Sequence, residues 1–310
     1  MITRTFKYGG VLFAVAWAAA CSAPTDDPVC IASTRHELRV CAAGPTVQGI
    51  DVSKYQQYVD WDLVKGAGKV FAITRASDGL NYNDMFFERN WNEMKRVGII
   101  RGVYQYFRAG QDPVRQANFM LDKVRDAGGF APGDLPVVLD LETKDGQETS
   151  VVVARAKRWL EYVESETGVR PIVYTANFMS SVMGSNFSAY PLWVANYTTQ
   201  CPLMPTGWTN WVIWQNSGSG SVPGVTGNCD TDTFNGTLAD LRAFVGLDAD
   251  GGVIAQPDGG ATQPDAGNNR PDAGATPDAG VPDAGGAGPL FPLDAGGERA
   301  GGNYTRQCHP

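Results

Sequence analysis

Histidine is almost missing from this sequence. Its 310 residues include only two, His36 and His309, and both lie near the ends of the chain. The long central part therefore has no imidazole for a Ser-His-Asp triad, a Cys-His pair or a histidine-ligated zinc site. We expect neither a metal ion nor any other cofactor, so the chemistry must come from other side chains.

Clusters of basic residues are missing as well. Lys and Arg together number 25 against 33 Asp and Glu, for a formal net charge of -8 at pH 7. Proteins that bind nucleic acid need grouped Lys and Arg to neutralise phosphates. The sequence therefore argues against a nucleic-acid partner.

The apolar run near the N-terminus is too short to span a membrane. Arg4 and Lys7 precede the apolar stretch 9–20, and small residues lead from it to Cys21. This order predicts a secretory signal segment over 1–21. Small residues before a cysteine also resemble a bacterial lipobox, so a lipid on Cys21 and plain cleavage are the two alternatives. Such a lipid is the only membrane attachment that we expect.

Six cysteines fit an exported protein, because disulfides persist in oxidising compartments. Cys30 can close a short loop with Cys41, and Cys201 can pair with Cys229. Cys308 is then left over. The sequence alone does not fix the connectivity, and other pairings stay open.

Composition divides the chain after the signal segment into three parts. Residues 22–45 form a short polar leader that contains cysteine, and residues 46–246 hold nearly all the aromatic and β-branched content. Residues 247–310 are rich in Pro, Asp, Ala and Gly and repeat the motif PDAG, so they predict a disordered tail without a core.

Strand-like and helical patterns alternate through the central part. Apolar runs occur at 47–52, 70–75, 99–107, 136–141, 170–175, 191–196, 211–215 and 229–234. Helical spacing separates several of them, over 84–97, 112–127, 150–167 and 238–245. This alternation predicts a (β/α)8 barrel of the α/β class. The later connections are too short or too rich in glycine for full helices, so we expect a modified, incomplete barrel.

Acidic and aromatic residues gather where the predicted strands end. In barrels of this kind the chemistry lies at the C-terminal ends of the strands. The residues at these ends are Asp51, Asp78, Tyr104, Tyr106, Arg108, Asp140, Glu142, Tyr174, Trp193, Asn196, Tyr197, Trp214, Gln215, Asp230 and Asp232.

Asp140 and Glu142 end the apolar run PVVLDLE, and a core strand has no structural need for two acids there. Residues i and i+2 of a strand point to one side, so both carboxyls face the mouth of the barrel. Neighbouring carboxylates raise each other's pKa, and Asp51 and Asp230 add to this effect. One acid then keeps a proton while another stays ionised, as cleavage of a glycosidic bond requires.

Several motifs, in this order, resemble the family 25 glycoside hydrolases, the N-acetylmuramidase-type lysozymes. They are GIDVSKYQ, FAITRASDG, GVYQYF, PVVLDLE, PIVYT, LWVANY, WVIWQ and CDTDTFNG, and the resemblance runs from about 48 to 246. It implies a modified α/β barrel that hydrolyses the β-1,4 bond between N-acetylmuramic acid and N-acetylglucosamine in peptidoglycan. The protein would then be a secreted or surface-attached monomer whose partner is the glycan strand.

The resemblance also implies roles for individual residues. Glu142 would be the general acid, and Asp140 would act either as nucleophile or by orienting the substrate's acetamido group. Asp51 and Asp230 would complete the acids of the floor, with Asp230 favoured over Asp232. The groove would be lined by Tyr104, Tyr106, Tyr174, Trp193, Asn196 and Gln215, and by Asp78 unless that residue only shapes a turn. Gln105 stands where we expect His, which would alter a subsite.

Two other functional classes remain open at this point. A protein that binds glycan without cleaving it would keep the groove but would not need a pair of acids. A metal-dependent hydrolase would use the same carboxylates as ligands for Mg²⁺ or Ca²⁺.

Overall fold

The computed structural model describes residues 38–254. The predicted signal segment with Cys21, the first part of the leader with Cys30, and the tail with Cys308 lie outside the described residues. The boundaries that we draw for leader, barrel and tail therefore stay predictions.

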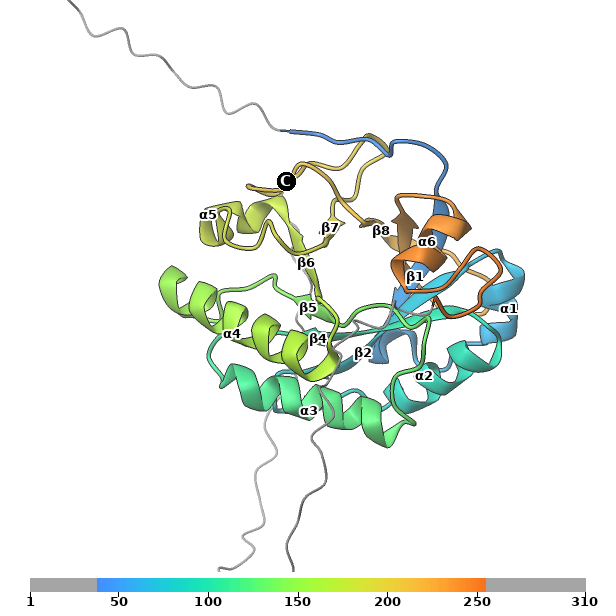
Figure 1. The fold of residues 1–310 in the computed structure, drawn as a ribbon, viewed down its shortest axis with the longest axis horizontal. Helices are drawn as coiled ribbons and strands as arrows, with labels where there is room; N and C mark the ends of the chain where they lie inside the picture. The colour runs from blue at the N-terminus through green and yellow to red at the C-terminus, as the bar shows by residue number, and fades with distance from the viewer. Residues whose placement is uncertain (1–37, 255–310) are drawn as a thin grey trace, which may run out of the picture. The chain divides into compact units, whose positions relative to one another are not determined.

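Strands form a closed ring at the centre of the described residues (Figure 1). In chain order they are β1 (Val47–Val52), β2 (Phe71–Asp78), β4 (Ile100–Tyr106), β5 (Val138–Asp140), β6 (Ile172–Ala176), β7 (Leu192–Ala195), β8 (Ile213–Gly220) and β9 (Cys229–Phe234). β1 pairs with both β2 and β9, which closes the ring, and the short β3 (Tyr82–Asn83) pairs with β2 outside it. The predicted modified barrel is confirmed.

One strand of the ring is reversed. β9 runs antiparallel to its neighbours β1 and β8, whereas the other pairs of adjacent ring strands are parallel. The beginning of β9 therefore lies beside the C-terminal end of β1. This reversal brings Asp230 opposite Asp51.

Helices cover only part of the ring. They are α1 (Trp61–Gly66), α2 (Phe87–Arg96), α3 (Pro113–Asp126), α4 (Thr149–Thr167), α5 (Ser180–Met183) and α6 (Leu238–Phe244), with 3-10 turns η1 (Lys54–Gln56) and η2 (Asn177–Met179). Figure 1 shows α1 to α4 as an arc outside the first strands, while loops follow β7 and β8. The barrel is incomplete in its helices, as expected. Between residues 38 and 254 no helix is long and apolar enough to cross a membrane.

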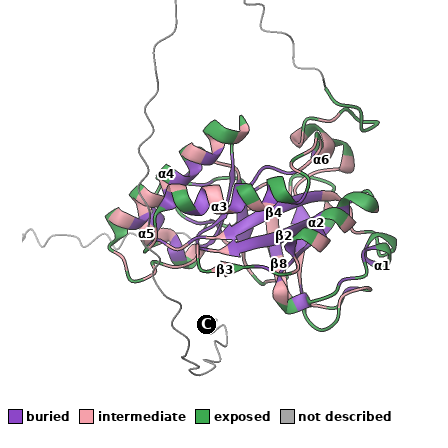
Figure 2. Cartoon of the chain, turned by 90° about the horizontal axis from the view of Figure 1, so that it is seen from below, coloured by how far each residue is buried: buried purple, intermediate pink, exposed green. Residues whose placement is uncertain are grey.

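Alternation along the strands produces two apolar layers. One set of side chains fills the inside of the ring, including Phe71, Ile73, Val138, Ile172, Ile213 and Phe234. The other set faces outward and packs against the helices, where Trp61, Trp91 and Trp159 are fully buried. Figure 2 shows the strands as mostly buried, whereas α3 and α4 carry buried, intermediate and exposed residues. Leu241 of α6 joins the inner layer, so this helix closes one end of the ring.

The disulfide differs from both pairings that the sequence suggested. Cys41 bonds to Cys201, 160 residues away, and Cys229 is a free, buried thiol. The pairings of Cys30 with Cys41 and of Cys201 with Cys229 are therefore wrong. A bridge between Arg39 and Leu203 runs beside the disulfide, so this stretch lies against the loop after β7.

Removing the disulfide should weaken the fold. We expect the double variant Cys41→Ser/Cys201→Ser to lower the free energy of unfolding by about 2–4 kcal/mol, because the open chain regains conformational freedom. Denaturant titration without reductant measures this loss. Adding reductant should lower the stability of the native protein by a similar amount and should leave that of the variant unchanged. An unchanged midpoint would show that the disulfide adds nothing to stability.

Candidate active site

Three acids lie on the inner side of the barrel where β1 and β9 meet. Asp51 on β1 is directly opposite Asp230 on β9, and Asp232 lies two residues further along β9. Residues i and i+2 of a strand share a face, so all three carboxyls point inward. Asp51 is 4 % exposed and Asp232 is fully buried. These acids form the floor of the site.

The second pair of acids comes from β5. Asp140 ends this strand, between Tyr106 of β4 and Tyr174 of β6. Pairing continues past the strand, because Leu141 N donates to Tyr174 O at 3.0 Å. The backbone therefore stays extended, and Glu142 points to the same side as Asp140.

The hydroxyl of Tyr174 lies within electrostatic reach of the acids from both sides. Burial raises the pKa of Tyr174 well above its ordinary value, and the charges of Glu142, Asp140 and Asp51 raise it further, with Tyr197 also contributing. Burial likewise raises the pKa of Tyr106, followed by the charges of Glu142 and Asp140. Both tyrosines therefore stay protonated and can donate hydrogen bonds at any working pH.

Gln215 on β8 joins two of these tyrosines to the floor. The hydroxyls of Tyr174 and Tyr197 donate to Gln215 Oε1 at 2.8 and 2.9 Å. Gln215 Nε2 donates to Asp51 Oδ2 at 2.6 Å. Because both polar ends of the amide are engaged, its orientation is fixed and so is the position of the Asp51 carboxyl.

A family comparison agrees with this arrangement. The family model for glycosyl hydrolases family 25 matches residues 50–225. The chain belongs to glycosyl hydrolase family 25. It is therefore a glycoside hydrolase, and the matched segment contains Asp51, Asp140, Glu142 and Gln215.

Relatives of this family 25 hydrolase include proteins named as lysozymes. Lysozyme M1 of Streptomyces globisporus is 33% identical over 211 residues, which cover 64% of this chain and 71% of that protein. The uncharacterized protein YegX of Escherichia coli (strain K12) is 36% identical over 209 residues, covering 66% of this chain and 75% of that protein. The crystal structure of a bacterial lysozyme from Streptomyces coelicolor matches with a TM-score of 0.59 and 32% identity, over 64% of this chain and 96% of that one.

Three of the aromatic residues predicted to line the groove lie below the surface of the family 25 site. Trp193 is 1% exposed, and its ring meets those of Tyr104 and Tyr174 edge to face at 6.4 and 4.7 Å. Tyr104 and Tyr174 are also buried. These rings support the floor, whereas Tyr106 and Tyr197 are accessible enough to touch a sugar.

The two remaining predicted residues lie at the edge of the site. The side-chain oxygen of Asn196 accepts a hydrogen bond from Leu203 N at 3.0 Å, so this residue holds the loop that carries Cys201. Asp78 forms an ion pair with the guanidinium of Arg108, whose Nη2 donates a hydrogen bond to Asp78 Oδ2 at 2.7 Å. This ion pair is partly exposed, so Asp78 remains open to a substrate at the rim.

Gln105 has no place in the groove, contrary to our expectation. Its side chain is fully buried on the outer side of β4, where it donates to Ser77 Oγ and to Gln116 O. Its oxygen accepts from Trp159 Nε1 of α4 at 2.7 Å. Alternation along β4 explains this, because Tyr104 and Tyr106 point inward and Gln105 between them points outward. A change at this position therefore alters packing and not a subsite.

The resemblance assigned no role to Tyr197, although the structure links it to Gln215. The ring of Tyr197 lies against Gly218, where an added Cβ would come within 3.0 Å of it. The glycine in β8 therefore makes room for the tyrosine. The position of Tyr197 just after the LWVAN run was the signal in the sequence that could have placed it at the site. Its bond to Gln215 could not be predicted from the sequence.

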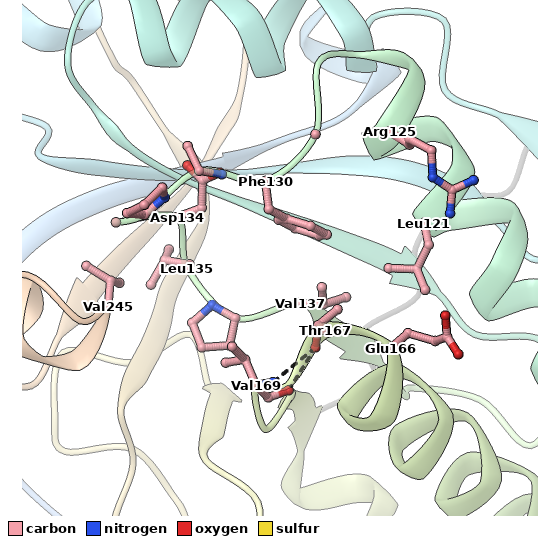
Figure 3. Close-up of a pocket in the computed structure, with 15 residues that line it drawn as sticks. Leu121, Arg125, Phe130, Asp134, Leu135, Val137, Glu166, Thr167, Val169 and Val245 are labelled. Carbon is pink, nitrogen blue, oxygen red and sulfur yellow. Dashed lines mark hydrogen bonds between the residues drawn. The ribbon is translucent and has the colours of Figure 1, made fainter. Parts of the chain in front are cut away.

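A separate pocket of about 480 Å³ lies away from the acids (Figure 3). It is bounded by the ends of α3 and α4 and by the loop before β5, with Phe130, Leu135 and Val137 among its lining residues. These segments precede the strands, so the pocket is at the N-terminal end of the ring. In such barrels that end serves stability. Among the described residues no group of His, Cys, Asp and Glu is arranged to hold a metal ion.

Proposed function

We propose that the protein is an exported muramidase that hydrolyses β-1,4 bonds between N-acetylmuramic acid and N-acetylglucosamine in peptidoglycan. The observation that carries this proposal is the convergence of Asp51, Asp140 and Glu142 on the buried hydroxyl of Tyr174. Membership of family 25 and relatives named as lysozymes support the same substrate.

Glu142 is the general acid in this proposal. It follows the end of β5 and is less buried than Asp140, so it is the carboxyl that a substrate can reach. In this proposal a proton resides on Glu142, because two carboxyls on one side of a strand end do not both ionise readily. Glu142 gives this proton to the glycosidic oxygen as the bond to the sugar's C1 breaks, and the freed sugar departs with a new hydroxyl.

Asp140 and Asp51 act on the other product of that cleavage. Positive charge develops at C1 and the ring oxygen, and buried carboxylates stabilise it more strongly than water would. Asp140 either attacks C1 or orients the acetamido group that does so. Water then completes the hydrolysis, and Asp230 belongs to the same floor.

The aromatic residues position the glycan. Tyr106 and Tyr197 are the tyrosines that a sugar can reach, while the buried Tyr104 and Trp193 hold the floor rigid. A rigid floor matters because a misplacement of about 1 Å lowers the rate by about 10²-fold.

Export follows from the signal-like segment 1–21 and from the kind of substrate. The disulfide between Cys41 and Cys201 fits an oxidising compartment. We propose a monomer that is either secreted or attached to the cell surface through a lipid on Cys21.

Mass spectrometry of digested peptidoglycan tests the function. Fragments are reduced with borohydride, which marks the sugar at each new reducing end. We expect that sugar to be N-acetylmuramic acid. A mark on N-acetylglucosamine would show a different bond specificity, and tight binding to cell walls without new reducing ends would favour a glycan-binding protein. Chelator added to the digest should have no effect.

A further inference from the structure

We propose that Asp232 is a positioning residue whose carboxyl shares one proton with that of Asp51, and that this hydrogen bond fixes Asp51 as the charged member of the pair. Asp232 has no assigned role in the reaction described above. The inference deepens the proposed muramidase function, since it concerns how the floor of that same site is set up.

The strand register places the two carboxyls next to each other. Asp232 is opposite Gly49 on β1 and opposite Gln215 on β8. Asp51 lies two residues beyond Gly49 on the same face, so it is the diagonal neighbour of Asp232 across the β1–β9 pair. Gly49 has no side chain, and the ring of Phe71 fills the place where its Cβ would be.

The two oxygens of Asp232 have different surroundings. Oδ1 accepts a hydrogen bond from Trp193 Nε1 at 2.9 Å. Oδ2 is buried, and within residues 38–254 no N–H or O–H group donates to it. The side chain that bonds to Asp232 from β1 is the Asp51 carboxyl. Two ionised carboxylates only accept hydrogen bonds, so this contact requires a proton on one of them.

The charges around Asp232 decide which carboxyl holds the proton. Complete burial raises the pKa of Asp232 well above its ordinary value, and the negative charge of Asp230 raises it further. The Trp193 N–H, the Lys69 ammonium and the bond to Asp51 oppose this rise but do not cancel it. The proton therefore resides on Asp232, because an ionised carboxylate there would be both desolvated and next to Asp230.

Asp51 then receives two donors. Gln215 Nε2 donates to its Oδ2 at 2.6 Å, and the protonated Asp232 donates as well. Hydrogen bonds to the charged form of a carboxyl favour that form. Asp51 is thereby held as an oriented negative charge close to Tyr174, whereas Asp232 is the fully buried member of the floor and does not touch the substrate.

Infrared difference spectra of the native protein and Asp232→Asn test the protonation directly. The native spectrum at neutral pH should contain one extra carbonyl band of a protonated carboxyl, which the variant lacks. Loss of carboxylate bands in the variant instead would overturn the proposal. This readout does not depend on cleavage of any glycan, so it stands apart from the test of the muramidase function.

Kinetics of two substitutions test the positioning role. Asn keeps an oxygen for Trp193 and offers an N–H to Asp51, so Asp232→Asn should keep kcat within about tenfold of the native value. Asp232→Leu removes both bonds and should lower kcat by about 10²-fold with little change in KM. The pH profile of Asp232→Asn should match the native profile, since no charge is removed. A shifted profile, or equal losses in the two variants, would contradict the role.

The pH dependence of stability gives a further check that needs only Asp232→Asn. The native pair keeps a proton that an unfolded Asp releases above about pH 4. The folded state then binds more protons than the unfolded state, so native stability falls as pH rises above this value. The variant does not lose stability in this way. The difference between its midpoint temperature of unfolding and that of the native protein should therefore increase between pH 4 and 7. A constant or falling difference would mean that Asp232 is ionised in the fold.

Discussion

Glu142→Gln should nearly abolish the release of reducing ends from peptidoglycan. We expect kcat to fall by about 10²–10⁴-fold, the usual contribution of a general acid. The amide has the same shape as the carboxyl but holds no proton that it can give to the glycosidic oxygen. Binding should persist, because the tyrosines and the other acids of the floor are unchanged.

Glu148→Gln is the matched control for this variant. Glu148 is exposed and makes no side-chain capping bond at the start of α4, so the same loss of one charge should leave turnover unaltered. Both variants should unfold at the native midpoint. If Glu142→Gln turned over peptidoglycan as fast as Glu148→Gln, Glu142 would not be the acid.

Arg101→Met should give the largest loss of stability among single substitutions outside the site. Arg101 is 2% exposed, and its Nε and Nη2 donate to the two oxygens of Asp134 at 2.8 and 3.0 Å. Its Nη1 also donates to Trp91 O, and its guanidinium lies over the Trp91 ring. Removing one member of a buried pair costs about 3–5 kcal/mol, because the other charge is left without its partner.

Arg125→Met is the comparison for Arg101→Met. Arg125 makes an ion pair with Asp122 at 2.6 Å, but both side chains are largely exposed. Pairs of that kind contribute at most about 1 kcal/mol, so this variant should unfold close to the native midpoint. Denaturant titrations of the two variants measure the difference. Equal losses would show that the Arg101 pair does not hold the loop before β5.

The strands and long helices could be predicted because their patterns are local. The apolar runs VQGIDV and PVVLDL and the helical spacing of Phe87, Trp91 and Met94 can each be recognised in one stretch of sequence. Short elements such as α1 and α5 have too few turns to show a period, so they were missed. Asp51 and Asp140 could be expected on one side of the barrel because the C-terminal ends of parallel barrel strands meet at one rim. Asp230 instead lies near the start of β9 and comes opposite Asp51 only because that strand is reversed, which the sequence did not predict.

The features that were missed depend on contacts between distant segments. Nothing near Cys41 indicates a partner 160 residues away, because only the closed ring brings the loop after β7 to it. Trp193 was predicted to line the groove, but the rings of Tyr104 and Tyr174 pack against it and bury it. The Tyr197–Gln215 bond likewise needs two strands in register. Side-chain direction could be predicted from sequence, whereas exposure and partners could not.

Synthetic aryl glycosides with leaving groups of different acidity test the central claim most directly, that Glu142 supplies the proton to the departing oxygen. An acidic phenol leaves without protonation, so the rate deficit of Glu142→Gln should be large for poor leaving groups and should shrink towards none for the most acidic phenol. The native enzyme should depend only weakly on the leaving group. A deficit that stays the same across the series would contradict the account, because the carboxyl would then contribute something other than a proton.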